Sequence, residues 1–280
     1  MMKKDENDWI VVIPSYNRVE GLKNMTLHTL KNLGIEWNRI YLFVANLEEK
    51  KKYMQEIKEG EDVKEIIVGE KGLVNVRNFI FRYFPVGQRL LSFDDDVLGF
   101  LQLKGNKLRP VNGDEFRNMV KVAFEECEKG GARLWGDYPV KNAFFMENSI
   151  SYDFKFIIGS FWGCINPGAS IKIPFGTGQK EDYQRTILFW EKDRAIIRLN
   201  YLTHITATYG ESGGLQSDGI GARVEMEKKV VSEMVEKWPE FVSINPRRKG
   251  VFPEILLRRQ PFAGERKMII GRRRTHKKLT

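Results

Sequence analysis

Short apolar runs alternate with amphipathic stretches over the first hundred residues of the chain. The apolar runs, each closed by turn-forming or charged residues, predict buried parallel strands at residues 9–13, 40–44, 65–68 and 89–93. Apolar residues at helical spacing predict helices between them, at residues 21–33, 48–58 and 74–83. Such alternation is typical of an open, mostly parallel sheet with helices on both faces, so the predicted fold class is α/β.

The pattern changes after residue 100. Here we expect a hairpin at 101–110, aromatic-rich strands at 142–146 and 152–164, and a loop rich in Gly and Pro at 166–178. Further helices are predicted at 114–129, 181–191 and 224–238, and strand-like structure at 195–208.

Positive charge gathers at the C-terminal end of the sequence. Residues 246–280 hold twelve Lys and Arg against two Glu, so this stretch carries the whole net charge of +9. We therefore divide the chain into a domain at 1–245 and a basic C-terminal arm at 246–280. A basic arm suits a polyanion, nucleic acid before an anionic membrane, although a solvated tail has the same composition. The predicted DNA contacts are Arg247, Arg248, Lys249, Arg272, Arg273 and Arg274.

Composition excludes several classes of protein. The chain is 42% hydrophobic, enough for a packed core, but has no apolar run of the roughly 20 residues that a membrane span needs. Its first eight residues are too acidic for a signal peptide, and Cys127 and Cys164 are too few for a disulfide framework. We expect a reduced, cytoplasmic protein that is neither secreted nor membrane-bound, as in the bacterial host of a phage or in an intracellular virus.

Polar clusters follow three of the predicted strands, at residues 14–18, 72–78 and 94–96. Ligands of doubly wound sheets bind beyond the carboxyl ends of the strands. Asp94 and Asp96 could hold one divalent cation there, Mg²⁺ or Mn²⁺, although an acidic turn closing a strand gives the same sequence. Arg77 could meet a phosphate or form an ion pair with one of the aspartates.

A second carboxylate pair, Glu181-Asp182, stands at the predicted start of a helix after the Gly-rich loop. A carboxylate in this place can act as a general base or cap the helix. His204 follows in a strand-like stretch, where it is either a packed core residue or a third metal ligand.

These motifs together resemble a known family. Ile13-Pro14-Ser15-Tyr16-Asn17-Arg18, residues 72–78, the aspartate triplet and Glu181-Asp182 occur in the order seen in GT-A glycosyltransferases, which have a Rossmann-like sheet. A resemblance to the TET/JBP-associated DNA glycosyltransferases lies in Trp135-Gly136, Phe144-Phe145-Met146, residues 158–163, Lys180-Glu181-Asp182 and Gly213-Gly214. The resemblance covers residues 9–245 and leaves the basic arm outside it.

The resemblance implies roles for individual residues on the donor side. Binding of the donor nucleotide would fall to Pro14, Ser15, Tyr16, Arg18, Arg77, Asp94, Asp95 and Arg223. Asp96 would bind the metal that bridges the diphosphate, with Asp94 beside it and His204 as a further ligand. Glu181 or Asp182 would be the catalytic base, and the family pattern leaves open which one.

It also implies a reaction. A sugar, most simply glucose from UDP-glucose, would pass with inversion to the hydroxymethyl group of 5-hydroxymethylcytosine or 5-hydroxymethyluracil in DNA. The base must be extruded or single-stranded to reach such a site. Phe161 and Trp162 are candidates to stack on the extruded base. For Phe161, ordinary core packing is the stronger expectation. For Trp162, core packing and stacking are about equally expected.

Other functions stay open at this point. A GT-A enzyme could act instead on a saccharide, protein or lipid acceptor. A nucleotidyltransferase also uses aspartates and a metal, although residues 12–20 contain no Gly-rich phosphate loop. A further alternative is a non-catalytic nucleic-acid-binding module whose former active site no longer works. The oligomeric state cannot be read from the sequence.

Overall fold

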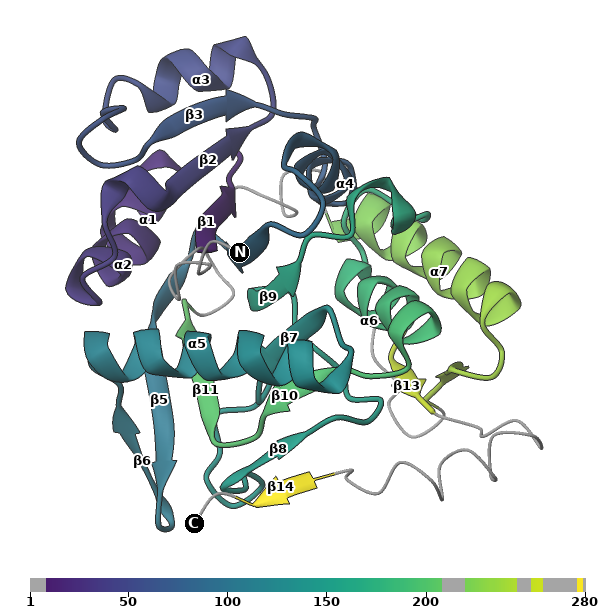
Figure 1. The fold of residues 1–280 in the computed structure, drawn as a ribbon. Coiled ribbons are helices and arrows are strands. Elements are labelled where there is room, and N and C mark those ends of the chain that lie inside the picture. The colour runs from purple at the N-terminus through teal and green to yellow at the C-terminus, as the bar shows by residue number, and fades with distance from the viewer. Residues whose placement is uncertain (1–8, 208–219, 246–252, 259–275, 279–280) are drawn as a thin grey trace.

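A nine-stranded sheet forms the centre of the protein in the computed structural model (Figure 1). The structure describes residues 9–207, 220–245, 253–258 and 276–278. The strand order of the sheet is β14-β8-β10-β7-β9-β4-β1-β2-β3. In chain order the strands are β1 (Trp9–Pro14), β2 (Ile40–Val44), β3 (Glu65–Val68), β4 (Arg89–Phe93), β7 (Leu134–Asp137), β8 (Ser149–Ser151), β9 (Phe161–Ile165), β10 (Ile197–Leu199) and β14 (His276–Lys278).

Seven of these nine strands point the same way. The pairs β1–β2, β1–β4, β2–β3 and β7–β10 are parallel, and only β8 and β9 run against the rest. The register places Phe93 of β4 opposite Phe161 of β9, and Asp137 of β7 opposite Leu199 of β10. The strands β1, β4, β7 and β10 therefore all end at one side of the sheet, which we call the carboxyl edge.

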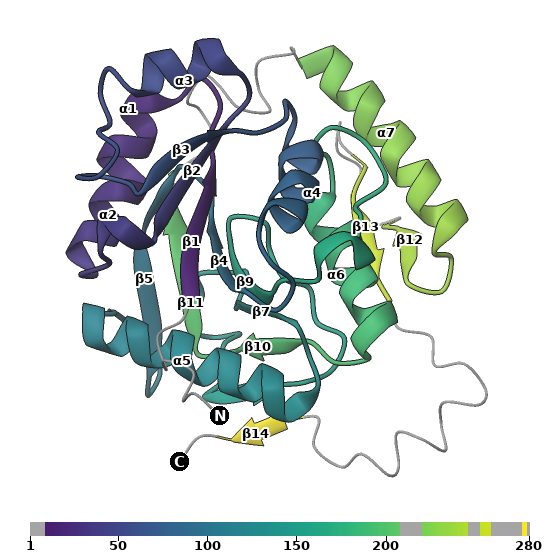
Figure 2. The ribbon, with the colours of Figure 1, turned by 45° about the horizontal axis from the view of Figure 1, so that its top comes forward.

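Helices cover both faces of this sheet (Figure 2). One face is packed by α1 (Val19–Leu22), a π-helical turn (Lys23–Leu27), α2 (His28–Asn32), α3 (Leu47–Tyr53) and α5 (Gly113–Gly130). The other is packed by α4 (Leu73–Tyr83), α6 (Glu181–Asp193) and α7 (Ile220–Lys237). Short 3-10 turns lie at Trp37–Arg39 and Gly168–Ser170. Each face has its own apolar core, so the predicted α/β fold with a mostly parallel sheet between helices is confirmed.

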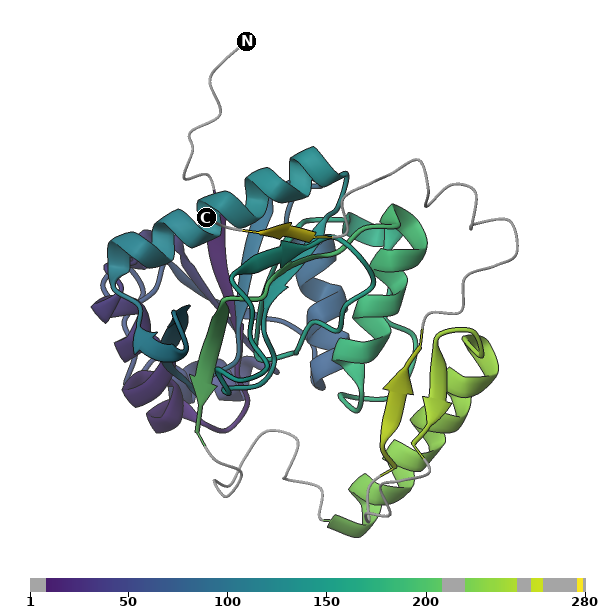
Figure 3. The same cartoon turned by 90° about the horizontal axis from the view of Figure 1, so that it is seen from below.

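Two small sheets complete the fold. The first has the order β11-β5-β6, built from β5 (Val97–Lys104), β6 (Lys107–Pro110) and β11 (Leu202–Thr206). The second pairs β12 (Val242–Ile244) with β13 (Ile255–Leu257), and lies beside α7 in the view from below (Figure 3). Ile255 packs into the core beneath α6 and α7, and β14 pairs with β8. The described parts of residues 246–280 thus pack on the domain.

The aromatic stretch 142–146 is not a strand, contrary to the sequence-based expectation. Asn142 organises a turn there, because its side-chain oxygen accepts from the backbone N–H of Phe144 and its carbonyl accepts from Phe145. Asn side chains commonly divert the backbone from a strand in this way. The strand predicted at 152–164 begins only at Phe161, and β7 was missed because its four residues are too few to show a period.

Neither cysteine forms a disulfide, as expected, and both are buried. Within the described ranges, every helix is too short or too polar to cross a membrane.

Candidate active site

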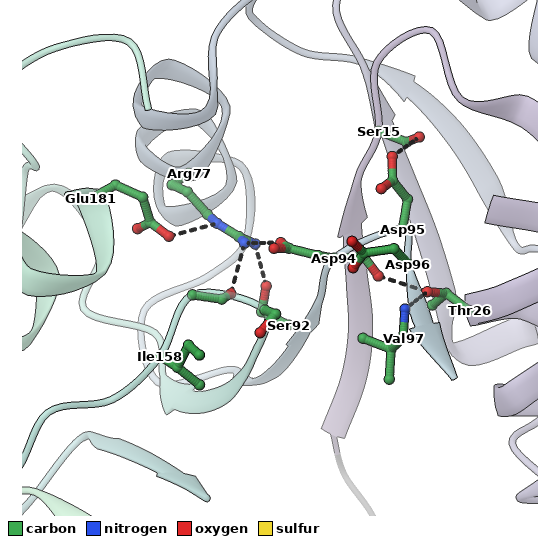
Figure 4. A network of polar contacts seen from close by, with 12 residues as sticks. Ser15, Thr26, Arg77, Ser92, Asp94, Asp95, Asp96, Val97, Ile158 and Glu181 are labelled. Carbon is green, nitrogen blue, oxygen red and sulfur yellow. Dashed lines mark hydrogen bonds and ion pairs between the residues drawn. The ribbon is translucent and has the colours of Figure 1, made fainter. Parts of the chain in front are cut away.

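The aspartate triplet forms a tight turn between β4 and β5 (Figure 4). Thr26 fixes this turn: its hydroxyl donates to the carbonyl of Asp94 (2.7 Å) and accepts from the backbone N–H of Val97 (2.9 Å). Thr26 lies in the π-helical turn, a local widening that is frequent near functional sites. The helix following β1 thus holds the acidic turn from the side.

Asp95 joins this turn to the loop that follows β1. Its carboxylate accepts from the Ser15 hydroxyl (2.6 Å) and from Arg18 Nη1 (3.1 Å). Asp95 is buried and already satisfied by these two donors, so the side chain fixes the β1 loop. Ser15 and Asp95, both expected to contact a donor nucleotide, bind each other in this structure.

The β1 loop is held in one conformation from a third direction. The Tyr53 hydroxyl contacts Ser15 Oγ (2.7 Å) and accepts from the Arg18 N–H (3.1 Å). Asn17 adopts a left-handed conformation (φ 56°), and its N–H donates to Glu49. Such backbone conformations persist where surrounding contacts enforce them. Tyr16, half-buried at the carboxyl edge, has the Lys71 ammonium 5.4 Å from its ring centroid.

Arg77 of α4 occupies the middle of the site and is 1% exposed. Its Nη2 donates to Asp94 Oδ1 (2.6 Å) and to the Gly159 carbonyl (3.2 Å), and its Nη1 donates to the Ser92 hydroxyl. Arg77 therefore forms the ion pair with an aspartate that the sequence left open as an alternative. Its own side of that pair is buried. Asp94 keeps 30% of its side chain exposed.

Glu181 is not exposed to solvent, because Arg185 covers it from one turn further along α6. Arg185 Nη1 donates to both Glu181 carboxylate oxygens (3.2 and 3.0 Å), and its Nη2 donates to the carbonyls of Ile157 and Ile158. Glu181 also lies 4.0 Å from Arg77 Nε. Its carboxylate thus balances two buried guanidinium groups.

The prediction that Trp162 stacks on an extruded base is wrong. Its ring is 1% exposed, and the guanidinium carbons of Arg77 and Arg185 lie 5.3 and 4.1 Å from its centroid. Cation–π contacts of this kind stabilise buried arginines. Phe161 is fully buried in the core of the other face, as favoured from the sequence.

Asp182 differs from its neighbour in environment. It is half-buried, and no Lys or Arg contacts its carboxylate among the ion pairs of the described residues. Its Oδ1 accepts from the N–H of Tyr183 (3.0 Å). Burial, and then the nearby charge of Glu181, raises the pKa of Asp182 to about 6. A carboxylate with a pKa near the working pH is suited to general-base catalysis.

The structure does not assemble the three-ligand metal site expected from Asp94, Asp96 and His204. His204 Nδ1 is bonded to Asp137 (2.7 Å) and Nε2 to Ser160 Oγ (2.6 Å), so both ring nitrogens are engaged. Burial opposes charge on the ring, but Asp137 outweighs it and raises the pKa of His204. No group of three or more His, Cys, Asp or Glu in the described part of the chain is arranged around a metal position.

The two remaining carboxylates still suit a cation. Burial raises the pKa of Asp94 to about 7 despite Arg77, and the negative charge of Asp96 adds to the rise. The Asp96 side chain is 23% exposed, and its carboxylate lies 3.8 Å from Arg18. An excess of negative charge on hard oxygen atoms favours Mg²⁺ or Mn²⁺, which usually takes further ligands from water or substrate phosphates.

Helix α7 is tied to the start of α6. Lys180, immediately before Glu181, has a left-handed backbone (φ 53°), and its ammonium pairs with the buried Glu227 of α7 at 2.8 Å. Arg223 stands four residues before Glu227, and residues at this spacing share a helix face. Arg223 is half-buried, and it stands one helical turn before the Glu227 that pairs with Lys180.

The remaining site residues predicted from the sequence are Pro14 and the six expected DNA contacts. Pro14 closes β1 and is buried there. The six expected DNA contacts, Arg247, Arg248, Lys249, Arg272, Arg273 and Arg274, lie outside the described residues.

Solved structures of low sequence identity resemble parts of this fold. S. aureus TarS 1–349 is 14% identical, with a TM-score of 0.48 over 81% of this chain and 65% of that one. The same protein in complex with UDP is 12% identical, with a TM-score of 0.47 over 81% of this chain and 65% of that one. The mannosyltransferase PcManGT from Pyrobaculum calidifontis, in complex with GDP-Man and Mn²⁺, is 11% identical. Its TM-score is 0.45 over 82% of this chain and 64% of that one. The chain therefore spans just under two thirds of these neighbours. No family model and no curated protein matches it.

Several residues that build the site were missed by sequence reasoning. Arg185 had a readable signal, since it stands four residues after Glu181 on a predicted helix. Thr26 and Tyr53 had none, because their contacts join segments far apart in the chain.

Removing the Tyr53 hydroxyl tests how firmly the β1 loop is held. Tyr53→Phe should lower the free energy of unfolding by about 1–2 kcal/mol, because two hydrogen bonds are lost inside the protein. Tyr41→Phe, on a half-buried ring of the neighbouring β2, is the matched control and should stay within about 0.5 kcal/mol of wild type. Urea denaturation measures the free energy of unfolding of both variants and of wild type. A Tyr53→Phe variant as stable as wild type would contradict the role of Tyr53.

Proposed function

We propose that this protein is a glycosyltransferase of the GT-A type that transfers a sugar from a UDP-sugar to the hydroxymethyl group of a 5-hydroxymethylpyrimidine in DNA. The observation that carries this proposal is that three separate segments bring carboxylates and a cation together at the carboxyl edge. Arg77 of α4 pairs with Asp94 of the acidic turn, which also holds Asp96. Arg77 also donates to the carbonyl of Gly159, and Asp182 lies beside that glycine.

The donor is assigned to the side of the site formed by the β1 loop. Tyr16 and Lys71 supply an aromatic ring and a cation at the ends of neighbouring segments, as a nucleoside with phosphates requires. Arg18 would lie by the phosphates, and Arg223 would approach them from α7. UDP-glucose is the donor that we propose.

The cation is assigned to Asp96, with Asp94 beside it and donor phosphates completing the coordination. When bound, a divalent cation supplies positive charge to a leaving diphosphate. His204 is left out of the ligand set, since Asp137 and Ser160 hold its ring.

Asp182 is assigned as the general base. It takes the proton of the acceptor hydroxyl while that oxygen bonds to the anomeric carbon of the sugar. The bond from that carbon to the diphosphate oxygen breaks, and its electron pair leaves with UDP. A single displacement inverts the anomeric centre, so an α-linked donor gives a β-linked product. Glu181 balances Arg185 and Arg77, and thereby positions the start of α6.

DNA is the proposed acceptor because of the basic arm. Twelve cations in residues 246–280 suit a polyanion better than a neutral saccharide. Residues 276–278 of the arm are paired with β8 of the central sheet, so the arm returns to the domain that carries the site.

Mass spectrometry of nucleosides tests the acceptor directly. DNA containing 5-hydroxymethylcytosine or 5-hydroxymethyluracil, incubated with protein, UDP-glucose and Mn²⁺, should gain one hexose on the modified base. DNA with unmodified cytosine is the control and should gain none, because it has no hydroxyl acceptor. If UDP is released but no hexose appears on the DNA, the protein is still a transferase and DNA is not its acceptor.

The pH profile tests the choice of base. Asp182 must be ionised to accept a proton, so kcat/KM should rise with pH, reach half its maximum near pH 6 and then level off. Asp182→Asn should lower kcat at least about 100-fold and abolish this acidic limb. Glu181→Gln should keep the limb, and loss of the limb in that variant would instead make Glu181 the base.

A further inference from the structure

An exposed aromatic pair stands out on the surface of the described residues. Phe144 is 85% exposed and Phe145 is 56% exposed, and their ring centroids are 5.1 Å apart at an interplanar angle of 82°. Both rings lie in the loop between β7 and β8. Adjacent apolar side chains this open to water mark a contact surface more often than single ones do.

The loop that carries these rings, residues 138–148, is tied down at several points. Tyr138 N–H donates to the Leu202 carbonyl (2.8 Å), and Glu147 N–H donates to the Asn200 carbonyl (3.2 Å). Met146, directly after the pair, is buried in the core. The Asn142 turn then leaves Phe144 and Phe145 outside. Their exposure therefore follows from how the loop is anchored.

This loop stands at the same edge of the sheet as the carboxylates. It leaves β7 at Asp137, which is level with Phe93 of β4 across β9, and it enters β8 at Ser149. Neighbouring strands are about 4.8 Å apart, so the loop spans the region roughly 10–20 Å from the acidic turn. A strand that keeps the stacked B-form spacing of about 3.4 Å per nucleotide covers this distance in some three to six nucleotides.

The basic arm reaches the same place. β14 pairs antiparallel with β8, with Lys278 opposite Ser149 and His276 opposite Ser151 (Figure 1). Ser149 directly follows the aromatic loop, so the last strand of the arm brings its two lysine positions beside that loop. An aromatic loop that continues into a strand paired with a lysine-bearing one has the two components of surfaces that bind single-stranded nucleic acid, where bases stack and phosphates meet cations.

We infer that Phe144 and Phe145 stack on nucleobases of the DNA acceptor that flank the modified nucleotide. The inference rests on the proposed function for the identity of the acceptor. It gives the stacking role to rings that are open to solvent, in place of the buried Trp162. A saccharide chain would also pack on aromatic rings, but it has no charge for the strand of the basic arm to meet.

The test compares Phe144→Ala/Phe145→Ala with Val140→Ala, a matched control on the same loop, in the full-length protein. Single-stranded oligonucleotides with one 5-hydroxymethylcytosine carry 2-aminopurine at three to six nucleotides on either side, and fluorescence reports both stacking and affinity. Wild type and the control should quench 2-aminopurine equally. The double alanine variant should lose the quenching and bind the oligonucleotide about 5- to 150-fold more weakly per lost base contact.

A double variant that keeps aromatic rings, Phe144→Tyr/Phe145→Tyr, should restore both signals. Hydrolysis of UDP-glucose without acceptor should be the same in all four proteins, since the loop is assigned no donor contact.

The possible results separate this inference from the proposed function. Equal quenching and affinity in the double alanine variant would overturn the stacking role, even if hexose transfer to DNA occurs. Weaker binding with lost quenching would support the role, even if no hexose is transferred. The stacking role would also be overturned if the wild type did not bind the oligonucleotide. The same holds if the double alanine variant lost binding of an oligosaccharide alone.

Discussion

The guanidinium of Arg77 links three segments that are far apart in the sequence. It reaches from α4 to the last residues of β4, to the acidic turn and to the Gly159 carbonyl that precedes β9. Because the group is almost completely buried, its charge must be met in place. Removing one partner of a buried ion pair typically costs about 3–5 kcal/mol. The geometry of Asp94 follows from this requirement, and the positions of Asp95 and Asp96 follow from Asp94.

A second buried cation extends the same network into α6. Burial lowers the pKa of Arg185, while Glu181 opposes that change most strongly among the nearby charges. Glu181, the face of Trp162 and two backbone carbonyls together hold this arginine. With Glu181 occupied in this way, Asp182 is the member of the pair left half-exposed. The two adjacent carboxylates thus acquire different roles from their surroundings.

Much of the site could be predicted from local sequence rules. Asp94–Asp96 and Arg77 were found because polar residues at strand ends gather at one edge of a parallel sheet. The rules failed where the answer depends on which side of an element is covered. Trp162 lies on a strand with helices over both faces, which its aromatic character alone does not reveal. Phe144 and Phe145 have high strand propensity, but the Asn142 turn and the buried Met146 place them in an exposed loop.

Isothermal titration calorimetry of UDP, with and without Mn²⁺, measures whether the acidic turn binds a nucleotide and a cation together. Wild type should bind UDP at least about ten-fold more tightly with Mn²⁺ than without it, a coupling of about 1.4 kcal/mol. Asp96→Asn should lose this gain while keeping the binding seen without the cation. Mn²⁺-independent binding by wild type, or an undiminished gain in Asp96→Asn, would contradict the assignment of the donor and cation to this edge of the sheet.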